Sequence, residues 1–242
     1  MKIYTNDILP QHLPDGEANP YWLEIRAGKF TASDFHQYMP IAKKGELSDT
    51  AESNLYKKVL ESVGYDFGES VKSAAMEQGT ELEPIARQEY IEKTFNDVRE
   101  VGFVDWEKLR AGCSPDGVIM TPFLKRITNK YYSCGDVICV DDEDVDWRIN
   151  KIIEIKCPEI KNYLRMADGK IPPVYMTQMQ YNMLITGAKS CDFVVYHPDM
   201  QLIVREISAD EDYQSQIVIA LEKLNKRYDE ILTQIKQFRK NN

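Results

Sequence analysis

The spacing of apolar residues predicts helices over much of the chain. Apolar side chains near helical spacing run from 210 to 238 and predict one long amphipathic helix. Shorter helical patterns cover residues 21–27, 34–39, 50–63, 71–94, 160–167 and 174–186. Within 71–94, Gly79 and Pro84 predict an interruption, and Thr80 with Glu83 has the form of a capping box that would restart the helix.

Alternating or β-branched stretches predict strands in the middle of the chain and near its end. They cover residues 98–105, 109–113, 118–121, 131–140, 151–156, 191–197 and 202–207, and the last two predict a hairpin. The first twenty residues, which contain several prolines, predict an irregular lead-in. This order predicts an α/β fold with a central mixed sheet flanked by helices. We expect a single domain over 1–242, with a β-hairpin-like insertion at about 121–150.

Composition and charge narrow the possible functions. Apolar residues make up 43% of the 242, which is enough to bury a core. The formal net charge of −9 excludes a strongly basic DNA-coating protein, but it leaves room for an enzyme with a local basic groove. We expect no secretory signal and no membrane span, because no apolar run is long enough for either.

The cysteines and histidines point away from two kinds of site. The five cysteines are odd in number, so reduced thiols are favoured over a disulfide framework. Cys134 and Cys139 have no second pair at zinc spacing, which disfavours a structural zinc site. The three histidines form no cluster along the sequence, so a histidine-based nuclease has little support.

The strand at 151–156 carries the candidate chemistry. Its alternation places Glu154 and Lys156 on one face, and Asp116 lies in a tight turn beside another predicted strand. Two carboxylates converging on Mg²⁺ beside a lysine would suit hydrolysis of a phosphodiester by a metal-activated water. The alternative is structural: Asp116 would favour its turn, and Glu154 with Lys156 would be a solvated pair on an edge strand.

Five blocks of sequence, taken in order, resemble the bacteriophage lambda exonuclease family of YqaJ-type viral recombinases. The blocks are Trp22 to Ser33, Gly79 to Tyr90, Ala111 to Val118, Glu154 to Pro158, and Tyr175 to Met183. The resemblance implies the restriction-endonuclease-like PD-(D/E)xK fold, in which a mixed sheet is flanked by helices. The insertion at 121–150 departs from the family pattern and could touch DNA, a neighbouring subunit or a partner protein, or simply be a solvated protrusion.

The resemblance also implies the residues of the site. The implied catalytic residues are Asp116, Glu154, Lys156, Glu83 and Gln178. Mg²⁺, or Mn²⁺ in its place, would be held by Asp116, Glu154, Glu83 and the main-chain carbonyl of Ile155. Lys156 would position the attacking water, and Gln180 competes with Gln178 for the place facing the site.

Arg26 and Ser33 match the family's pocket for a 5′-terminal phosphate. Arginine offers several donors to phosphate oxygens, and Ser33 would add a hydroxyl at the start of a helix. The alternative is a surface arginine and an ordinary helix cap. Trp22, in the same block, is expected in the core.

The resemblance leads us to expect a Mg²⁺-dependent 5′→3′ exonuclease that acts on linear double-stranded DNA and leaves 3′ single strands for phage-type recombination. An endonuclease or nickase of the same fold, and a catalytically silent DNA-binding module, are the alternatives. The expected partners are double-stranded DNA ends, further copies of the chain in a homotrimer and a phage single-strand annealing protein. The expected location is the cytoplasm of a bacterial host.

Overall fold

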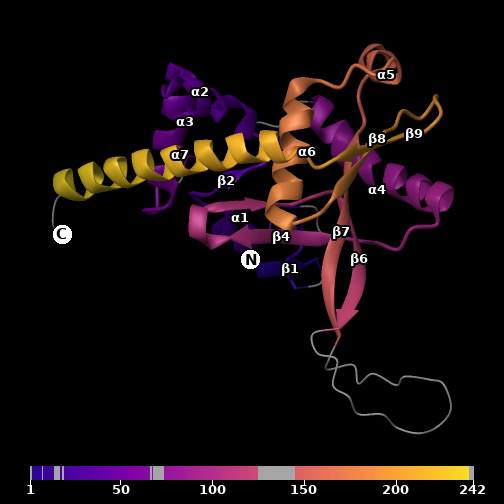
Figure 1. Cartoon of the computed structure of the whole chain (residues 1–242), viewed down its shortest axis with the longest axis horizontal. Coiled ribbons are helices and arrows are strands. Elements are labelled where there is room, and N and C mark those ends of the chain that lie inside the picture. Colours follow the sequence, from indigo (N-terminus) through magenta and orange to yellow (C-terminus); the bar gives the residue numbers. More distant parts are fainter. Residues whose placement is uncertain are drawn as a thin grey trace, which may run out of the picture.

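The computed structural model describes residues 2–6, 8–13, 17, 19–65, 67, 74–124 and 145–239. The strands are β1 (Lys2–Thr5), β2 (Phe30–Thr31), β3 (Val98–Arg99), β4 (Val101–Trp106), β5 (Ala111–Cys113), β6 (Gly117–Leu124), β7 (Val145–Lys156), β8 (Ser190–Val195) and β9 (Ile203–Ser208). They form two mixed sheets within these residues, ordered β1-β4-β5-β2 and β3-β6-β7-β8-β9 (Figure 1).

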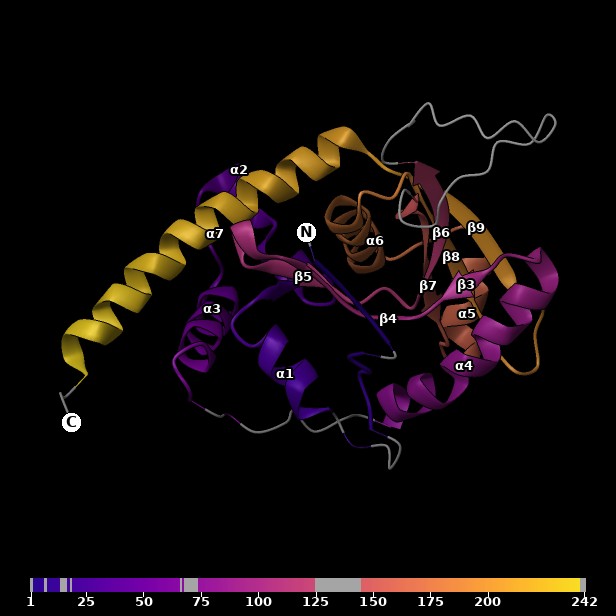
Figure 2. The same ribbon diagram turned by 90° about the horizontal axis from the view of Figure 1, so that it is seen from below.

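Helices cover both sheets. They are α1 (Pro20–Arg26), the 3₁₀ helix η1 (Phe35–Tyr38), α2 (Pro40–Lys44), α3 (Asp49–Glu61), α4 (Ala74–Thr94), the 3₁₀ helix η2 (Glu107–Leu109), α5 (Ile160–Ala167), α6 (Pro173–Thr186) and α7 (Glu211–Phe238). Helix α6 packs against strands of both sheets, and α7 runs along the outside of α2, α3 and α6 (Figure 2). The mixed sheets flanked by helices confirm the predicted fold class.

The first residues of the expected irregular lead-in form a strand, β1, whereas the described residues between β1 and α1 belong to none of the helices and strands given above. Strand β1 pairs antiparallel with β4, with Ile3 opposite Val104. Ile3 packs against the main core, which Val104 also joins. Because β1 has its partner about 100 residues away, its local sequence carries little sign of it.

Strand β7 lies inside the second sheet, between β6 and β8. It pairs antiparallel with β6 and parallel with β8. Successive side chains of β7 alternate between two cores: Ile153 and Ile155 pack with Ala86 and Tyr90 of α4, whereas Ile152 joins the main core. Helices α4 and α6 therefore cover opposite faces of this strand.

Besides the long helical connection from β2 to β3, the chain makes two short crossings between the sheets. Strand β3 belongs to the second sheet and β4 to the first, with Glu100 between them. The chain returns to the second sheet between β5 and β6, through Ser114, Pro115 and Asp116. The single central sheet expected from the sequence is thus two sheets, and the second crossing carries a candidate site residue.

Two helical predictions need correction. Helix α4 continues through Pro84, although an interruption was expected there. Proline removes one helical hydrogen bond, but Ala86 and Tyr90 are both fully buried against the second sheet, and this packing stabilises the helix on the far side of the proline. The helix expected at 34–39 is the 3₁₀ helix η1, followed by α2.

The predicted strand at 131–140 and most of the insertion at 121–150 lie outside the described residues. The strands on either side of it, β6 and β7, pair along their length from Gly117 with Ile153 to Leu124 with Val145. The helices of the described ranges include none that is long and apolar enough to cross a membrane.

Candidate active site

Asp116 is held from two directions at the second crossing between the sheets. Its carboxylate oxygen Oδ2 accepts a hydrogen bond from the main-chain N–H of Ile155 at 2.6 Å. Its main-chain carbonyl accepts one from Nε of Arg87 at 2.9 Å. The turn sequence therefore brings this carboxylate to the end of β7, beside the acid of the Glu154-Ile155-Lys156 segment.

Glu154 is completely buried on β7, and both of its carboxylate oxygens have partners. Oε1 accepts a hydrogen bond from the ammonium of Lys156, and Oε2 accepts one from Nδ2 of Asn182 at 3.0 Å. A buried carboxylate is costly unless it is paired and hydrogen-bonded. The pairing excludes the alternative of a solvated pair on an edge strand.

Lys156 lies between the acids and an aromatic ring. Its side chain is 20% exposed, and its Nζ lies 5.1 Å from the centre of the Tyr175 ring on α6. Burial lowers the pKa of the ammonium, but the carboxylates of Glu154 and Asp116 outweigh this effect and raise its pKa above the usual value. Lys156 is therefore a cation and a hydrogen-bond donor in this structure.

Glu83 adds a third carboxylate from α4. Burial and the charge of Asp116 raise the pKa of Glu83 to about 7, although Arg87 opposes the shift. Burial, followed by the charges of Asp116 and Glu83, raises the pKa of Glu154 to about 7 against the opposing effect of Lys156. Burial also raises the pKa of Asp116. Three acids whose ionisation is hindered share one region of the molecule, as is typical of functional sites.

A pocket of about 300 Å³ opens beside Glu83 and Asp116. Polar side chains from the start of the chain form another part of its wall. The lining residues are Asn6, Pro10, Gln11, His12, Thr80, Glu83, Pro84, Arg87, Glu100, Val101, Pro115 and Asp116. The side of the site that carries Glu83 and Asp116 is thus open to a polar ligand, at the junction of the N-terminal segment, α4 and the second crossing.

The donor set suits a hard divalent cation. Asp116, Glu154 and the main-chain carbonyl of Ile155 are oxygen donors on adjacent segments, and oxygen ligands are what Mg²⁺ prefers. In the described part of the chain, no three His, Cys, Asp or Glu side chains are already arranged around one point as a metal cage. This is compatible with Mg²⁺, which usually binds through one or two carboxylates and keeps several waters.

Helix α6 separates the two glutamine candidates. Gln180 is buried, donates to the carbonyl of Ser208 at 2.9 Å and accepts from the N–H of Asp210 at 2.9 Å. It thereby joins α6 to the segment before α7. Gln178 is half-buried and precedes Asn182 by four residues, so the two share a helix face. Asn182 contacts Glu154, so this face of α6 is turned towards the acids. Gln178 is therefore favoured over Gln180 as the glutamine nearer the site.

Arg26 and Ser33 lie apart from these acids along the chain, at α1 and after β2. The guanidinium of Arg26 stacks on the Trp22 ring at 4.2 Å, and its Nη2 donates to Oγ1 of Thr31 at 3.4 Å. Burial lowers the pKa of Arg26 more than the nearby Asp34 and Glu61 raise it. Ser33 is exposed in the turn between β2 and η1.

Within the described residues, Arg26 makes no ion pair. Trp22 is buried, and its Nε1 donates to the carbonyl of Gly102 at 2.8 Å, which agrees with its expected place in the core.

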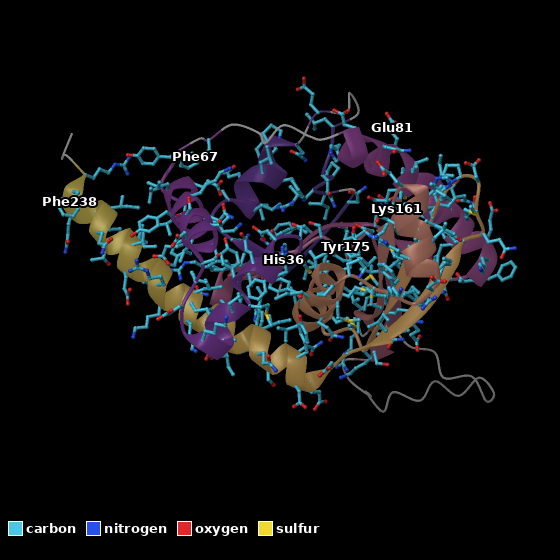
Figure 3. All side chains as sticks on the ribbon, turned by 90° about the horizontal axis from the view of Figure 1, so that it is seen from above. His36, Phe67, Glu81, Lys161, Tyr175 and Phe238 are labelled. Carbon is cyan, nitrogen blue, oxygen red and sulfur yellow. The ribbon has the colours of Figure 1, made fainter. Side chains whose placement is uncertain are left out.

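Sequence reasoning missed three residues that contact the candidate site: Asn182, Arg87 and Tyr175. Two of them had a signal in helical spacing, because Arg87 follows Glu83 by four residues and Asn182 follows Gln178 by four. Figure 3 labels Tyr175 in the middle of the view, and its side chain is half-buried, whereas Phe238 lies at the outer end of α7. The direction in which each of these side chains points depends on packing.

Comparison with solved structures finds two chains of one alkaline exonuclease, LHK-Exo from Laribacter hongkongensis. One is 27% identical, covers 91% of this chain and 100% of its own, and superposes with a TM-score of 0.64. The other, LHK-Exo in complex with dAMP, is 27% identical, covers 90% of this chain and 97% of its own, and has a TM-score of 0.68.

A phage-related exonuclease from Haemophilus somnus 129PT shares the fold, with 18% identity, a TM-score of 0.57, and coverage of 86% of this chain and 96% of its own. No curated protein matches the sequence. The family model of the YqaJ-like viral recombinase domain matches residues 21–189. This range includes both short crossings between the sheets, the three acids and Lys156. The chain belongs to the YqaJ-like viral recombinase family.

Proposed function

We propose that this protein is a Mg²⁺-dependent 5′→3′ exonuclease that degrades one strand of linear double-stranded DNA and leaves a 3′ single strand. Membership of the family and similarity to an alkaline exonuclease support a nuclease. The observation that carries the metal-dependent chemistry is the hydrogen bond from the Ile155 N–H to Asp116, which brings that acid beside Glu154 and Lys156.

Each residue of the site would have its own role in hydrolysis. Asp116, Glu154 and the Ile155 carbonyl would hold Mg²⁺, with Glu83 supporting the site from α4. When bound, Mg²⁺ supplies positive charge that polarises the phosphate and lowers the pKa of a bound water. Lys156 donates hydrogen bonds, orienting the attacking water and stabilising the charge that develops on the phosphate.

The direction of digestion would depend on Arg26 and Ser33. Arg26 is half-buried, and among the described residues no carboxylate forms an ion pair with it, although Asp34 and Glu61 act on its charge from nearby. A 5′-terminal phosphate would supply the anion that it lacks, and the guanidinium can donate to several phosphate oxygens. The complex of LHK-Exo with dAMP supports release of mononucleotides.

We extend the proposal to partners and location. The family resemblance favours a homotrimer, a phage single-strand annealing protein as partner, and action in the cytoplasm of a bacterial host. Chromatography with light scattering measures the number of subunits directly. A mass of one 28.0 kDa chain would contradict the trimer.

The decisive experiment is digestion of linear duplex DNA labelled at its 5′ or its 3′ ends, with Mg²⁺ and with EDTA. With Mg²⁺ we expect early release of the 5′ label and DNA products that keep the 3′ label on single strands. In EDTA we expect no digestion. Covalently closed circular DNA should remain intact. Nicking of the circle would favour the alternative of an endonuclease or nickase, and no digestion of any substrate would favour a silent binding module.

A further inference from the structure

Asn182 is the side-chain partner that helix α6 provides for Glu154. Its Nδ2 lies 3.0 Å from Oε2 of Glu154, and both residues are completely buried. The other carboxylate oxygen, Oε1, contacts Lys156. Asn182 therefore donates to the carboxylate oxygen that Lys156 does not contact. Because each oxygen has its own donor, the carboxylate is held in one orientation.

The chemistry of the pair requires a donor at position 182. An ionised carboxylate can only accept hydrogen bonds, and the amide of asparagine supplies an N–H without adding charge. Oδ1 of Asn182 is buried and has no hydrogen-bond partner among the described residues. A buried polar atom without a partner is costly. The side chain of Asn182 therefore donates to Glu154 although its amide oxygen is left without a hydrogen bond.

The backbone around Asn182 is anchored to the opposite sheet. The hydroxyl of the preceding residue, Tyr181, donates to the carbonyl of Phe30 in β2 at 2.7 Å. Thr186, one turn later, donates to the carbonyl of Asn182 at 2.7 Å. Helix α6 is thus attached to the first sheet while it delivers the Asn182 amide to β7 in the second.

We propose that Asn182 is a positioning residue of the active site, which holds Oε2 of Glu154 so that the carboxylate keeps the orientation needed for the metal. The inference rests on the proposed metal-dependent function. Partners that orient a ligating carboxylate contribute about 10- to 100-fold to metal affinity. Loss of the Asn182 amide should therefore weaken metal binding by about that factor while leaving the fold in place.

The test is calorimetric titration of Mn²⁺ into the DNA-free protein, as wild type and as Asn182→Leu, which has a similar size but no donor. Asn225→Leu is the matched control, because Asn225 donates to the carbonyl of Leu109 and accepts from Arg110, away from the acids. We expect the Mn²⁺ dissociation constant to rise at least tenfold in Asn182→Leu and to stay within twofold of wild type in Asn225→Leu.

A second measurement covers the case in which Asn182→Leu does not fold. In the wild-type protein, the side-chain amide NMR signals of Asn182 should shift when Mg²⁺ is added, and those of Asn225 should not. The inference about Asn182 would be wrong if a folded Asn182→Leu variant bound Mn²⁺ as tightly as wild type, or if the Asn182 amide signals did not shift with Mg²⁺. Either result would leave the proposed function standing. A wild-type protein that binds no Mn²⁺ would overturn the proposed function, and the inference with it.

Discussion

Arg87 and Asp116 join helix α4 to the point where the chain passes from the first sheet to the second. Nε of Arg87 donates to the Asp116 carbonyl at 2.9 Å, while Nη2 and Nη1 reach Glu83 at 2.5 Å and Glu100 at 3.0 Å. Glu100 lies at the crossing from β3 to β4, and Asp116 lies at the crossing from β5 to β6. The guanidinium of Arg87 therefore contacts both short crossings between the sheets. The planar fork of arginine allows these three contacts at once, and a lysine ammonium lacks that geometry.

Replacing Arg87 with lysine should therefore reduce both stability and activity. We expect the free energy of unfolding to fall by about 1–3 kcal/mol, because hydrogen bonds to charged and partly buried groups are lost. Exonuclease turnover should fall as well, since the Asp116 turn loses its support. Urea unfolding and single-turnover digestion measure the two effects. Arg99→Lys, at an exposed pair with Asp97, should change neither, and an Arg87→Lys variant as stable as wild type would contradict the role assigned here.

Replacing Lys156 with alanine should remove most of the catalysis. The ammonium is the donor nearest to Glu154, and loss of one donor to developing charge slows catalysis about 100- to 1,000-fold. The measurement is the initial rate of linear duplex digestion with saturating Mg²⁺. Lys161→Ala, an exposed lysine on α5, is the control and should keep the full rate. Unchanged digestion by Lys156→Ala would show that the lysine has no part in the reaction.

Arg26 should determine the preference for a phosphorylated 5′ end. Wild-type protein is expected to digest 5′-phosphorylated duplex faster than 5′-hydroxyl duplex, because the phosphate gives the guanidinium an anionic partner. Arg26→Ala should lower the first rate and leave the second nearly unchanged. The ratio of the two rates on matched duplexes is the measurement. A variant that discriminates as well as wild type would exclude Arg26 from the phosphate site.

The raised pKa of Glu83 predicts how the metal-free protein responds to pH. Because the pKa in the folded protein is about 7 and the ordinary value is 4.5, the folded state holds its proton more tightly than the unfolded state. The stabilising effect of this protonation is complete below about pH 4.5. It is lost as the pH rises through about 7.

Thermal denaturation in EDTA at pH 5 and pH 8 tests this dependence by comparison with Glu83→Gln, which cannot ionise. The stability of wild type relative to Glu83→Gln should decrease from pH 5 to pH 8. Glu81→Gln, on the exposed side of the same helix, should show no such change relative to wild type. A difference between wild type and Glu83→Gln that is constant with pH would mean that the Glu83 carboxyl titrates normally.

Local patterns were sufficient where an element depends on its own residues. The helix predicted at 160–167 is α5, and the helix predicted at 174–186 begins one residue earlier, as α6. The alternation of β7 correctly placed Ile153 and Ile155 on the face opposite Glu154. Helical and strand periods are set by backbone geometry, which neighbouring residues impose on one another.

By itself the sequence determined the fold class, the family and the acids that motif spacing could name, whose catalytic roles stay predictions. Only the tertiary structure decided that β1 is a strand, that α4 continues through Pro84, and that Asn182 reaches Glu154. The reason is physical: each of these depends on packing between segments far apart in the chain, and such contacts leave almost no mark on the residues nearby. Sequence patterns record local geometry, whereas the directions of side chains such as Arg87 and Asn182 are set by the surfaces they meet.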